Sequence, residues 1–169
     1  MNEDYLRHLD QLVAAPKKFL GEVRWQDEGR PSGTLFFVAS IAVNDSDSDG
    51  LKLNGRAALS GLVNWISVTL SSDTIPVERF WYLPYGSHVN KSPPWSPIEI
   101  HKIRCPAGIN RRYAWSDNRT YPHDHRQEMA RMVLNINLVD SKAALAYILT
   151  TMNISGEIPP PPYQATLGL

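Results

Sequence analysis

The segment Thr120–Met129, TYPHDHRQEM, contains the residues whose types and spacing most clearly suggest chemistry. His123 and His125 lie two positions apart, and Arg119 and Arg126 flank them. Histidine changes its charge near neutral pH, and its neutral ring is a common protein ligand for metals. The pattern therefore fits three interpretations: a metal site, an acid–base site, and a polar contact loop.

A metal site would require His123 and His125 to converge on one ion. In an extended strand, residues i and i+2 face the same side, so both rings could reach a common ion while Asp124 points away. The third ligand would then come from His101 or His88. Two histidines in a short segment are common by chance. We therefore expect no cofactor, and zinc is the alternative that such ligands would favour.

An acid–base site could act on a phosphodiester. A histidine would take the proton from a ribose 2′-hydroxyl, and a second group would support the developing charge. The catalytic candidates are His101, His123 and His125. Arginines would pair with phosphates and aromatic rings would stack on bases. The candidates for anion or nucleic-acid binding are Arg111, Arg112, Arg119, Arg126, Tyr113 and Tyr121.

The same arginines and tyrosines also fit a purely structural interpretation. In a strand over RRYAWSD, Arg112 and Ala114 would lie on one face, and Tyr113 and Trp115 on the other. A solvated basic face with aromatic rings packed in the core behind it explains the alternation equally well. Both interpretations stay open on the sequence alone.

The segment Gly86–Ile103 contains the run PPWSP, which cannot be a central strand because proline lacks a backbone donor. This run predicts a rigid loop that either presents the indole of Trp95 or folds it back onto the core. An exposed tryptophan on a stiff loop is a good anchor for a partner. The candidate partner-binding residues are Trp95, His88 and Asn90.

The charge of the chain is zero overall but unevenly distributed. Residues 1–50 carry five basic and nine acidic side chains, whereas residues 101–131 carry seven basic and three acidic ones. The basic stretch contains the histidine motif. Zero net charge gives no overall steering toward nucleic acid and favours a binding protein. The local cluster of histidine and arginine favours action on nucleic acid.

Length and composition predict a single domain in a reducing, cytoplasmic setting. The chain has 169 residues, and 43% of them are hydrophobic, which is enough to bury one core. Cys105 is the only cysteine, which excludes an internal disulfide and a zinc site built on cysteine pairs. The longest apolar run, TLFFVASIAV, is too short to span a bilayer. The N-terminus lacks the pattern of a signal peptide, and we expect no membrane partner.

The periodicity of the chain predicts an α+β fold. Apolar residues recur at helical intervals over 2–14 and 141–153, with Asp140 as the N-cap of the second helix. Between them lie short runs rich in β-branched and aromatic residues. We expect one domain over 1–157. It should be a twisted antiparallel β-meander of six to eight strands, with both helices on one face and the other face partly open. Residues 158–169 should form a proline-rich extended tail.

The segment NDSDSDGLK, residues 44–52, matches the first half of a calcium-binding EF-hand loop. The twelfth position should be a bidentate glutamate but is Arg56. We therefore expect a polar hairpin turn in which Gly50 has a positive φ.

Residues 75–154 resemble a group of small, largely uncharacterised prokaryotic proteins of mobile elements. The resemblance lies in ERFWYLPYGSHVN, IEIHKI and NLVDSKAALAYILTTMNI. In that group an Arg-led strand precedes His-x-Asn-Pro, His-x-His and a C-terminal helix. Two positions differ here, because Lys91 stands where the proline would be and Glu99 where the first histidine of His-x-His would be. The positions implied by the resemblance are Arg79, His88, Asn90 and His101.

The segment PHDHR before a terminal helix is similar to toxins of small toxin–antitoxin pairs, and it implies a role for His123 and His125. Together the two resemblances imply a setting of conflict between a host and a phage or mobile element. One function class is an inhibitor-like or toxin-like binding protein that engages a host protein complex or nucleic acid through its basic His/Arg/aromatic surface. Trp95 and the acidic turn at 45–49 would anchor a protein partner. The alternative is a His-dependent ribonuclease toxin.

We further predict that Asn118–Arg126 is solvent-accessible and lies at the open face of the sheet. Pro122 interrupts any strand ladder, and Asp117 begins a turn-forming pair. Only Tyr121 in this segment could bury a large apolar surface. The segment should therefore be a contact surface, with Arg119 and Arg126 holding an anionic partner.

Overall fold

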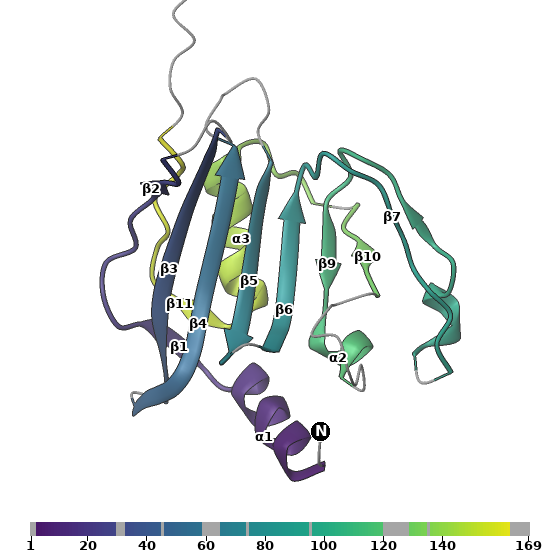
Figure 1. Cartoon of the computed structure of the whole chain (residues 1–169), viewed down its shortest axis with the longest axis horizontal. Coiled ribbons are helices and arrows are strands. Elements are labelled where there is room, and N and C mark those ends of the chain that lie inside the picture. Colours follow the sequence, from purple (N-terminus) through teal and green to yellow (C-terminus); the bar gives the residue numbers. More distant parts are fainter. Residues whose placement is uncertain are drawn as a thin grey trace, which may run out of the picture.

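The computed structural model describes residues 3–29, 33–44, 46–58, 65–73, 75–94, 96–119, 129–134 and 136–162, and only the backbone of 46–49 (Figure 1). The helices are α1 (Glu3–Ala14), α2 (Trp115–Asn118) and α3 (Ser141–Thr151), with a 3-10 turn η1 (Ile98–Ile100). The strands are β1 (Lys17–Phe19), β2 (Gln26–Asp27), β3 (Thr34–Val43), β4 (Ser46–Ala58), β5 (Ile66–Ser72), β6 (Ile75–Tyr82), β7 (His88–Val89), β8 (Arg104–Cys105), β9 (Arg111–Tyr113), β10 (Arg131–Met132) and β11 (Ile154–Ser155).

A large, almost entirely antiparallel sheet confirms the predicted mixed fold. Its order is β10-β9-β6-β5-β4-β3-β1-β11, and β2 pairs beside β3, which gives nine strands instead of the expected six to eight. Strands β3 to β6 follow one another as neighbours, but β9 then pairs with β6 after the separate β7–β8 hairpin. One pair, β1 with β11, is parallel, which the sequence did not predict.

One face of the sheet packs on α3, and we call it the helix face. Strand residues of alternate positions form this core, because successive side chains in a strand point to opposite sides. Ile41, Val68 and Phe80 pack there with Leu145 and Ile148 of α3. The side chain of Asp140 accepts a hydrogen bond from the Ala143 amide (2.7 Å) and so confirms the predicted N-cap.

Helix α1 lies below the lower end of the sheet in Figure 1, where α2 is also found. Its buried residues Leu6 and Leu9 pack against Val77 of β6 and Trp115 of α2. The ammonium group of Lys17 donates hydrogen bonds to the carbonyls of Val13 (2.8 Å) and Ala15 (2.6 Å) and so caps the helix. The expectation that both helices pack on one face is therefore not confirmed, because α3 and α1 contribute buried residues to different core clusters.

Gly55 in the middle of β4 makes room for an aromatic ring on the helix face. Phe37 is its cross-strand partner in β3, and a Cβ added at Gly55 would lie 2.0 Å from the Phe37 ring. Trp25 packs edge-on against the same ring, with 4.8 Å between the centroids. The missing side chain therefore lets two aromatic residues fill the core at this point.

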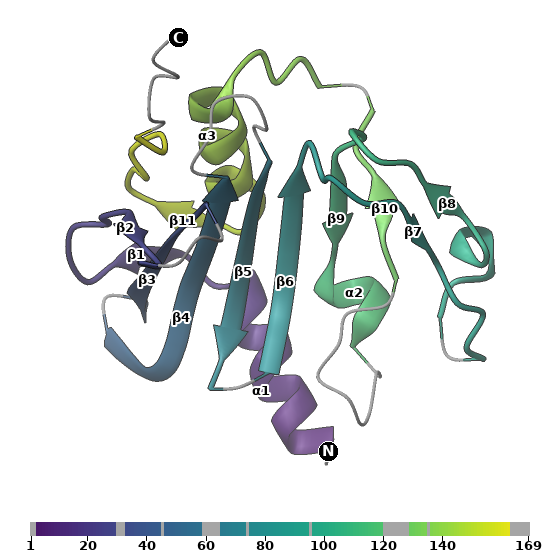
Figure 2. The same cartoon turned by 45° about the horizontal axis from the view of Figure 1, so that its top comes forward.

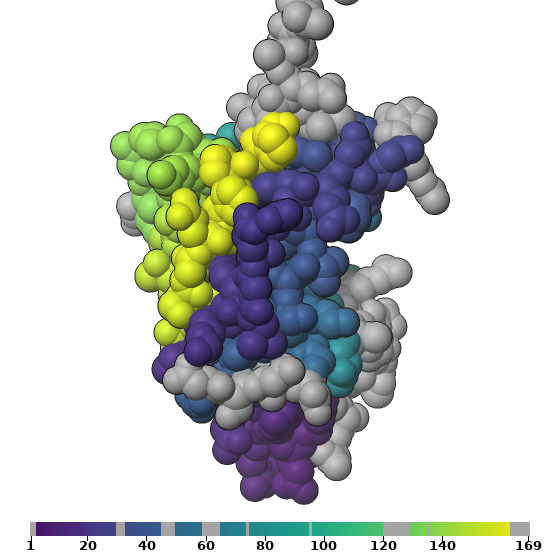
Figure 3. All heavy atoms as spheres, turned by 90° about the vertical axis from the view of Figure 1, so that its left-hand side faces the viewer, coloured from purple at the N-terminus to yellow at the C-terminus, as the bar shows by residue number. Residues whose placement is uncertain are grey.

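The C-terminal segment returns to the sheet beside β1. Figure 3 shows residues of this segment, in yellow, lying along the N-terminal strand region. Ile158 is buried in the core, and the Trp25 indole donates a hydrogen bond to the Pro159 carbonyl (2.7 Å). The boundary expected at residue 157 therefore precedes a core residue. Among the described residues, no helix has the length and apolar character needed to cross a membrane.

The turn between β3 and β4 is a tight hairpin connection, as Val43 pairs with Ser46. Gly50 has a φ of +86°, as expected, but it lies within β4 and not in the turn itself. A Cβ at this position would meet the side chain of Asp73, 2.2 Å away. The described part of the chain contains no group of three or more His, Cys, Asp or Glu residues placed to hold a metal ion.

Candidate functional site

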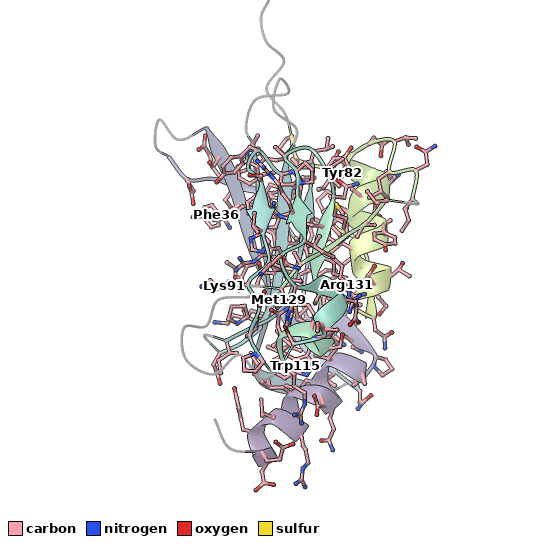
Figure 4. All side chains as sticks on the ribbon, turned by 90° about the vertical axis from the view of Figure 1, so that its right-hand side faces the viewer. Phe36, Tyr82, Lys91, Trp115, Met129 and Arg131 are labelled. Carbon is pink, nitrogen blue, oxygen red and sulfur yellow. The ribbon has the colours of Figure 1, made fainter. Side chains whose placement is uncertain are left out.

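The face of the sheet opposite α3 carries two neighbouring rows of side chains, and we call it the open face. Figure 4 shows Phe36 on this side, away from α3. Residues in register on adjacent antiparallel strands lie side by side, so each row crosses five strands from β3 to β9. The first row is Phe36, Arg56, Ser67, Trp81 and Arg111, and the second is Val38, Asn54, Thr69, Arg79 and Tyr113.

A groove of about 640 Å³ runs over the β3–β5 part of the two rows. Its lining is mixed: the amide of Asn54 and the hydroxyls of Ser67 and Thr69 lie beside the apolar side chains of Phe36, Phe37 and Val38. An ion pair between Arg56 and Glu28 also belongs to its lining. The groove thus offers hydrogen-bonding groups that are already arranged on rigid strands.

Arg79 of β6 lies next to the Thr69 end of the groove. Its Nε donates a hydrogen bond to the Thr69 hydroxyl (3.1 Å). Among the described residues, no carboxylate pairs with its guanidinium. Burial lowers the pKa of Arg79, the nearby Tyr113 raises it, and the charge of Arg111 lowers it again. The side chain is therefore a half-buried positive charge that its described surroundings do not neutralise.

Arg111 of β9 lies between two aromatic rings. Its guanidinium carbon is 5.8 Å from the centre of the Trp81 ring and 6.0 Å from that of Tyr113. Only 7% of the residue is exposed, and its Nη1 donates to the Gly86 carbonyl (2.9 Å). Its Nε is buried without a hydrogen-bond partner. Cation–π contacts of this kind hold the guanidinium plane in place.

The aromatic contacts continue beyond Arg111 on both sides. Trp81 packs against Trp65 and Tyr85, with ring centroids 5.6 and 5.8 Å apart, and Tyr85 is 69% exposed. At the other end, the Tyr113 ring lies 5.2 Å from the ring of His88. The result is a continuous series of flat groups that is half-buried at His88, buried at Tyr113 and exposed at Tyr85.

Residues 84–110 form an arm that carries β7 and β8, seen at the right of Figure 1 and Figure 2. The arm covers the β9 end of the open face, because Cys105 and Ile103 pack against Tyr113 and Trp81. Burial raises the pKa of the Cys105 thiol. The open face is therefore accessible from β3 to β6 and closed by the arm beyond Arg79.

Several predicted binding residues meet on this face, and others do not. Arg111, Tyr113 and His88 come together as described above. Arg112 lies on the helix face, where it binds the buried carboxylate of Glu78 (2.7 Å). This alternation of Arg112 and Tyr113 is the one expected for a strand over RRYAW.

Arg119 lies at the end of α2 and forms ion pairs with two acidic side chains of α1. Its Nε donates to Asp10 (2.9 Å), and its Nη2 donates to Glu3 (2.8 Å). The hydrogen bond from Arg119 lowers the pKa of the Asp10 carboxyl. In this structure the guanidinium joins two helices and does not lie on the open face.

The remaining predicted residues fall outside the open face or outside the described part of the chain. Asn90 is buried, and its amide nitrogen donates to the carbonyls of Ile100 and Ala130, both at 2.8 Å. The His101 ring is 2.7 Å from the Ser96 hydroxyl within the arm. The predictions that concern Trp95, Tyr121, His123, His125 and Arg126 lie outside the described residues.

Asn118 and Met129 are both buried, which corrects one expectation. Asn118 was expected to be solvent-accessible, but it is buried and hydrogen-bonded to Met129 at both backbone groups. Asp117, also buried, binds Arg131 through two hydrogen bonds (2.7 and 2.8 Å). Asparagine is typical of turns, but here its amide replaces a missing strand partner.

Trp65, Trp81, Tyr85 and Thr69 belong to the site but were not selected from the sequence. A usable signal exists for Trp81, because VERFWY alternates and Phe80 is an obvious core residue. No local signal shows that β9 pairs with β6 and brings Arg111 beside Trp81. Comparisons of the chain with family models, curated proteins and solved structures found no match.

Proposed function

We propose that the protein is a binding protein whose open face holds single-stranded RNA. The observation that carries the proposal is the series of flat groups Tyr113, Arg111, Trp81, Trp65 and Tyr85 beside a groove with hydrogen-bonding side chains on the same sheet face. Unpaired bases stack on aromatic rings and guanidinium planes, and each stacked base contributes about 1–3 kcal/mol. Bases that stack at the exposed end would leave the rest of the strand to lie along the groove.

The chemistry of the groove supports a polar, extended ligand. Asn54, Ser67 and Thr69 offer donors and acceptors that suit base edges and ribose hydroxyls. The large apolar side chains of the two rows in this groove are Phe36 and Val38, of which Val38 is 58% exposed. A stable protein–protein interface usually has a more apolar centre. A nucleic-acid strand is therefore the better match, and a protein partner is an outcome of the test below.

The described residues favour binding over catalysis at this face. His88 is the histidine that adjoins it, and its ring lies against Tyr113 and not over the groove. As part of the proposal we retain the setting that the resemblance implies, in which the protein acts in conflict between a mobile element and its host.

The proposal is tested by fluorescence anisotropy with the full chain and a short labelled RNA of mixed sequence. We expect the single strand to bind and the matching duplex to bind at least about tenfold more weakly, since its bases are already stacked. Tyr85→Ala should weaken binding of the single strand about tenfold. Val139→Ala, which removes another exposed side chain far along the chain, is the control and should bind like the wild type.

Two results would contradict the proposal. The first is a wild-type protein that does not bind the single strand at low salt. The second is equal binding by the wild type and Tyr85→Ala, which would place the RNA elsewhere. If the RNA does not bind and the wild type copurifies with a stoichiometric protein that Tyr85→Ala releases, then the open face binds protein.

A further inference from the structure

Arg79 and Arg111 differ from three other arginines of the described chain in their charge balance. Arg56, Arg112 and Arg131 each form an ion pair with a carboxylate of the described chain. Neither Arg79 nor Arg111 has such a carboxylate among the described residues, although both are withdrawn from solvent. A buried positive charge costs free energy unless a counter-charge accompanies it. The two side chains therefore present a site for an anion.

The sheet register places the two arginines close together. Arg79 is the cross-strand partner of Tyr113, and Arg111 lies two residues before Tyr113 on the same face. They are thus diagonal neighbours, and the charge of Arg111 is felt at Arg79. The Nε of Arg111 is buried without a partner, which leaves a donor that the described protein does not use.

The position of Arg79 beside the groove limits which anion fits. Its Nε is held by Thr69, a residue of the groove lining, so its two terminal amino groups are left for a ligand. Beyond Arg79 the arm covers Tyr113 and Arg111. A strand that lies in the groove therefore meets a closed end at this point. An internal phosphate would need the strand to continue past Arg79, whereas a terminal phosphate would not.

We propose that Arg79, with the charge of the buried Arg111 behind it, binds the terminal phosphate of the RNA strand held in the groove. The inference rests on the proposed function and specifies the end of the strand that the site selects. A terminal phosphate carries close to two negative charges at neutral pH, which matches two guanidinium groups better than the single charge of an internal phosphate does. Planar guanidinium groups also bind phosphate oxygens through paired hydrogen bonds.

The experiment compares single strands of one sequence that end in a 5′-phosphate, a 3′-phosphate or only hydroxyls. Binding to the wild type, Arg79→Gln and Arg56→Gln is measured by anisotropy, and the fold is checked by thermal melting. We expect one of the phosphorylated strands to bind the wild type at least about tenfold more tightly than the hydroxyl strand. Arg79→Gln should abolish that preference, so that the phosphorylated and hydroxyl strands bind it equally.

Arg56→Gln is the matched control, because it removes an arginine from the same face on β4, two strands away from Arg79 on β6. It should keep the preference for the phosphorylated strand. If Arg79→Gln melts at a lower temperature, Arg79→Lys serves as the second variant. Lysine keeps the charge but not the paired hydrogen bonds, so it should show a reduced preference.

The failures of the two proposals are distinguishable. If the wild type binds all three strands equally, the terminal-phosphate site is wrong while RNA binding stands. If no RNA binds, the proposed function is wrong. The phosphate site at Arg79 is then tested by thermal melting in the presence of inorganic phosphate alone. A rise in the melting temperature of the wild type, absent in Arg79→Gln and in sodium chloride of equal ionic strength, would support the phosphate site. An equal shift of the melting temperature in the wild type and in Arg79→Gln would contradict the phosphate site.

Discussion

Asn118 and Met129 are joined by two hydrogen bonds although they lie 11 positions apart in the chain. The Asn118 amide nitrogen donates to the Met129 carbonyl (2.9 Å), and its oxygen accepts from the Met129 amide (3.0 Å). Asn90 binds the next residue, Ala130, in the same two-point manner. Two buried side chains thus take the place of a neighbouring strand where the chain returns toward β10.

Replacing Asn118 with alanine should destabilise the protein by about 2–4 kcal/mol, because two buried backbone groups of Met129 lose their partner. Urea unfolding followed by tryptophan fluorescence measures the change. Asn118→Asp keeps the acceptor but loses the donor, so it should also be destabilising. Lys142→Ala, at an exposed position of α3, is the control. A change of less than about 0.5 kcal/mol for Asn118→Ala would show that the pairing is dispensable.

Gly55→Ala should destabilise the protein by about 1–3 kcal/mol, because the added methyl group would overlap the Phe37 ring. Gly21→Ala is the matched control, since a Cβ at Gly21 meets nothing within 4 Å. The double variant Gly55→Ala with Phe37→Leu should recover part of the loss, which chemical denaturation can show. Equal stability of the two single variants would mean that the ring moves aside without cost.

Lys17 should make the stability depend on pH under alkaline conditions. Burial lowers its pKa from 10.5 to about 8, against the opposing effect of Glu78. Between these values the unfolded chain keeps a proton that the folded protein has lost, so the free energy of unfolding rises with pH. At about 1.4 kcal/mol per unit, the rise is about 2–3 kcal/mol.

The control for Lys17 is Lys17→Met, which removes the titrating group. The difference in unfolding free energy between wild type and variant should increase in favour of the wild type from pH 7 to pH 10.5. Tyrosines that titrate in this range contribute equally to both proteins. A constant difference across the range would show that the folded protein keeps the Lys17 proton.

The purified protein should leave single-stranded RNA intact, as expected for a binding protein. Incubation with a mixed RNA pool followed by gel electrophoresis measures this. The ribonuclease alternative predicts that the protein degrades the RNA. It also predicts that the double variant His123→Ala and His125→Ala does not degrade the RNA, at an unchanged melting temperature. The control is Lys142→Ala, which should behave like the wild type in either case.

The sequence predicts those features that depend on neighbouring residues. Alternation in RRYAW places Arg112 and Tyr113 on opposite faces, and Asp140 caps α3, because both follow from local geometry. Pairings between distant segments are not encoded locally. The neighbours of β9, the Glu78 partner of Arg112 and the bonds of Asn118 all depend on how separate strands meet.

Because pairings between distant segments are not encoded locally, only part of the candidate site could be predicted from the sequence. Arg111 and Tyr113 were selected because a basic residue and an aromatic residue stand close in the chain. Trp81 joins them only through the pairing of β6 with β9. Asn90 looks like a surface residue by type, but its amide satisfies buried backbone groups that the sequence does not reveal.

The parallel pairing of β1 with β11 has a consequence for synthesis on the ribosome. Lys17 of β1 pairs with Ile154 of β11. The first strand of the sheet therefore gains this partner only after nearly all of the described chain has been synthesised. Strands β3 to β6 can pair as soon as they emerge, since each contacts its predecessor. Until β11 arrives, β1 is an unpaired sheet edge, which is the kind of edge that invites aggregation. Synthesis of β11 is therefore the step that completes this side of the fold.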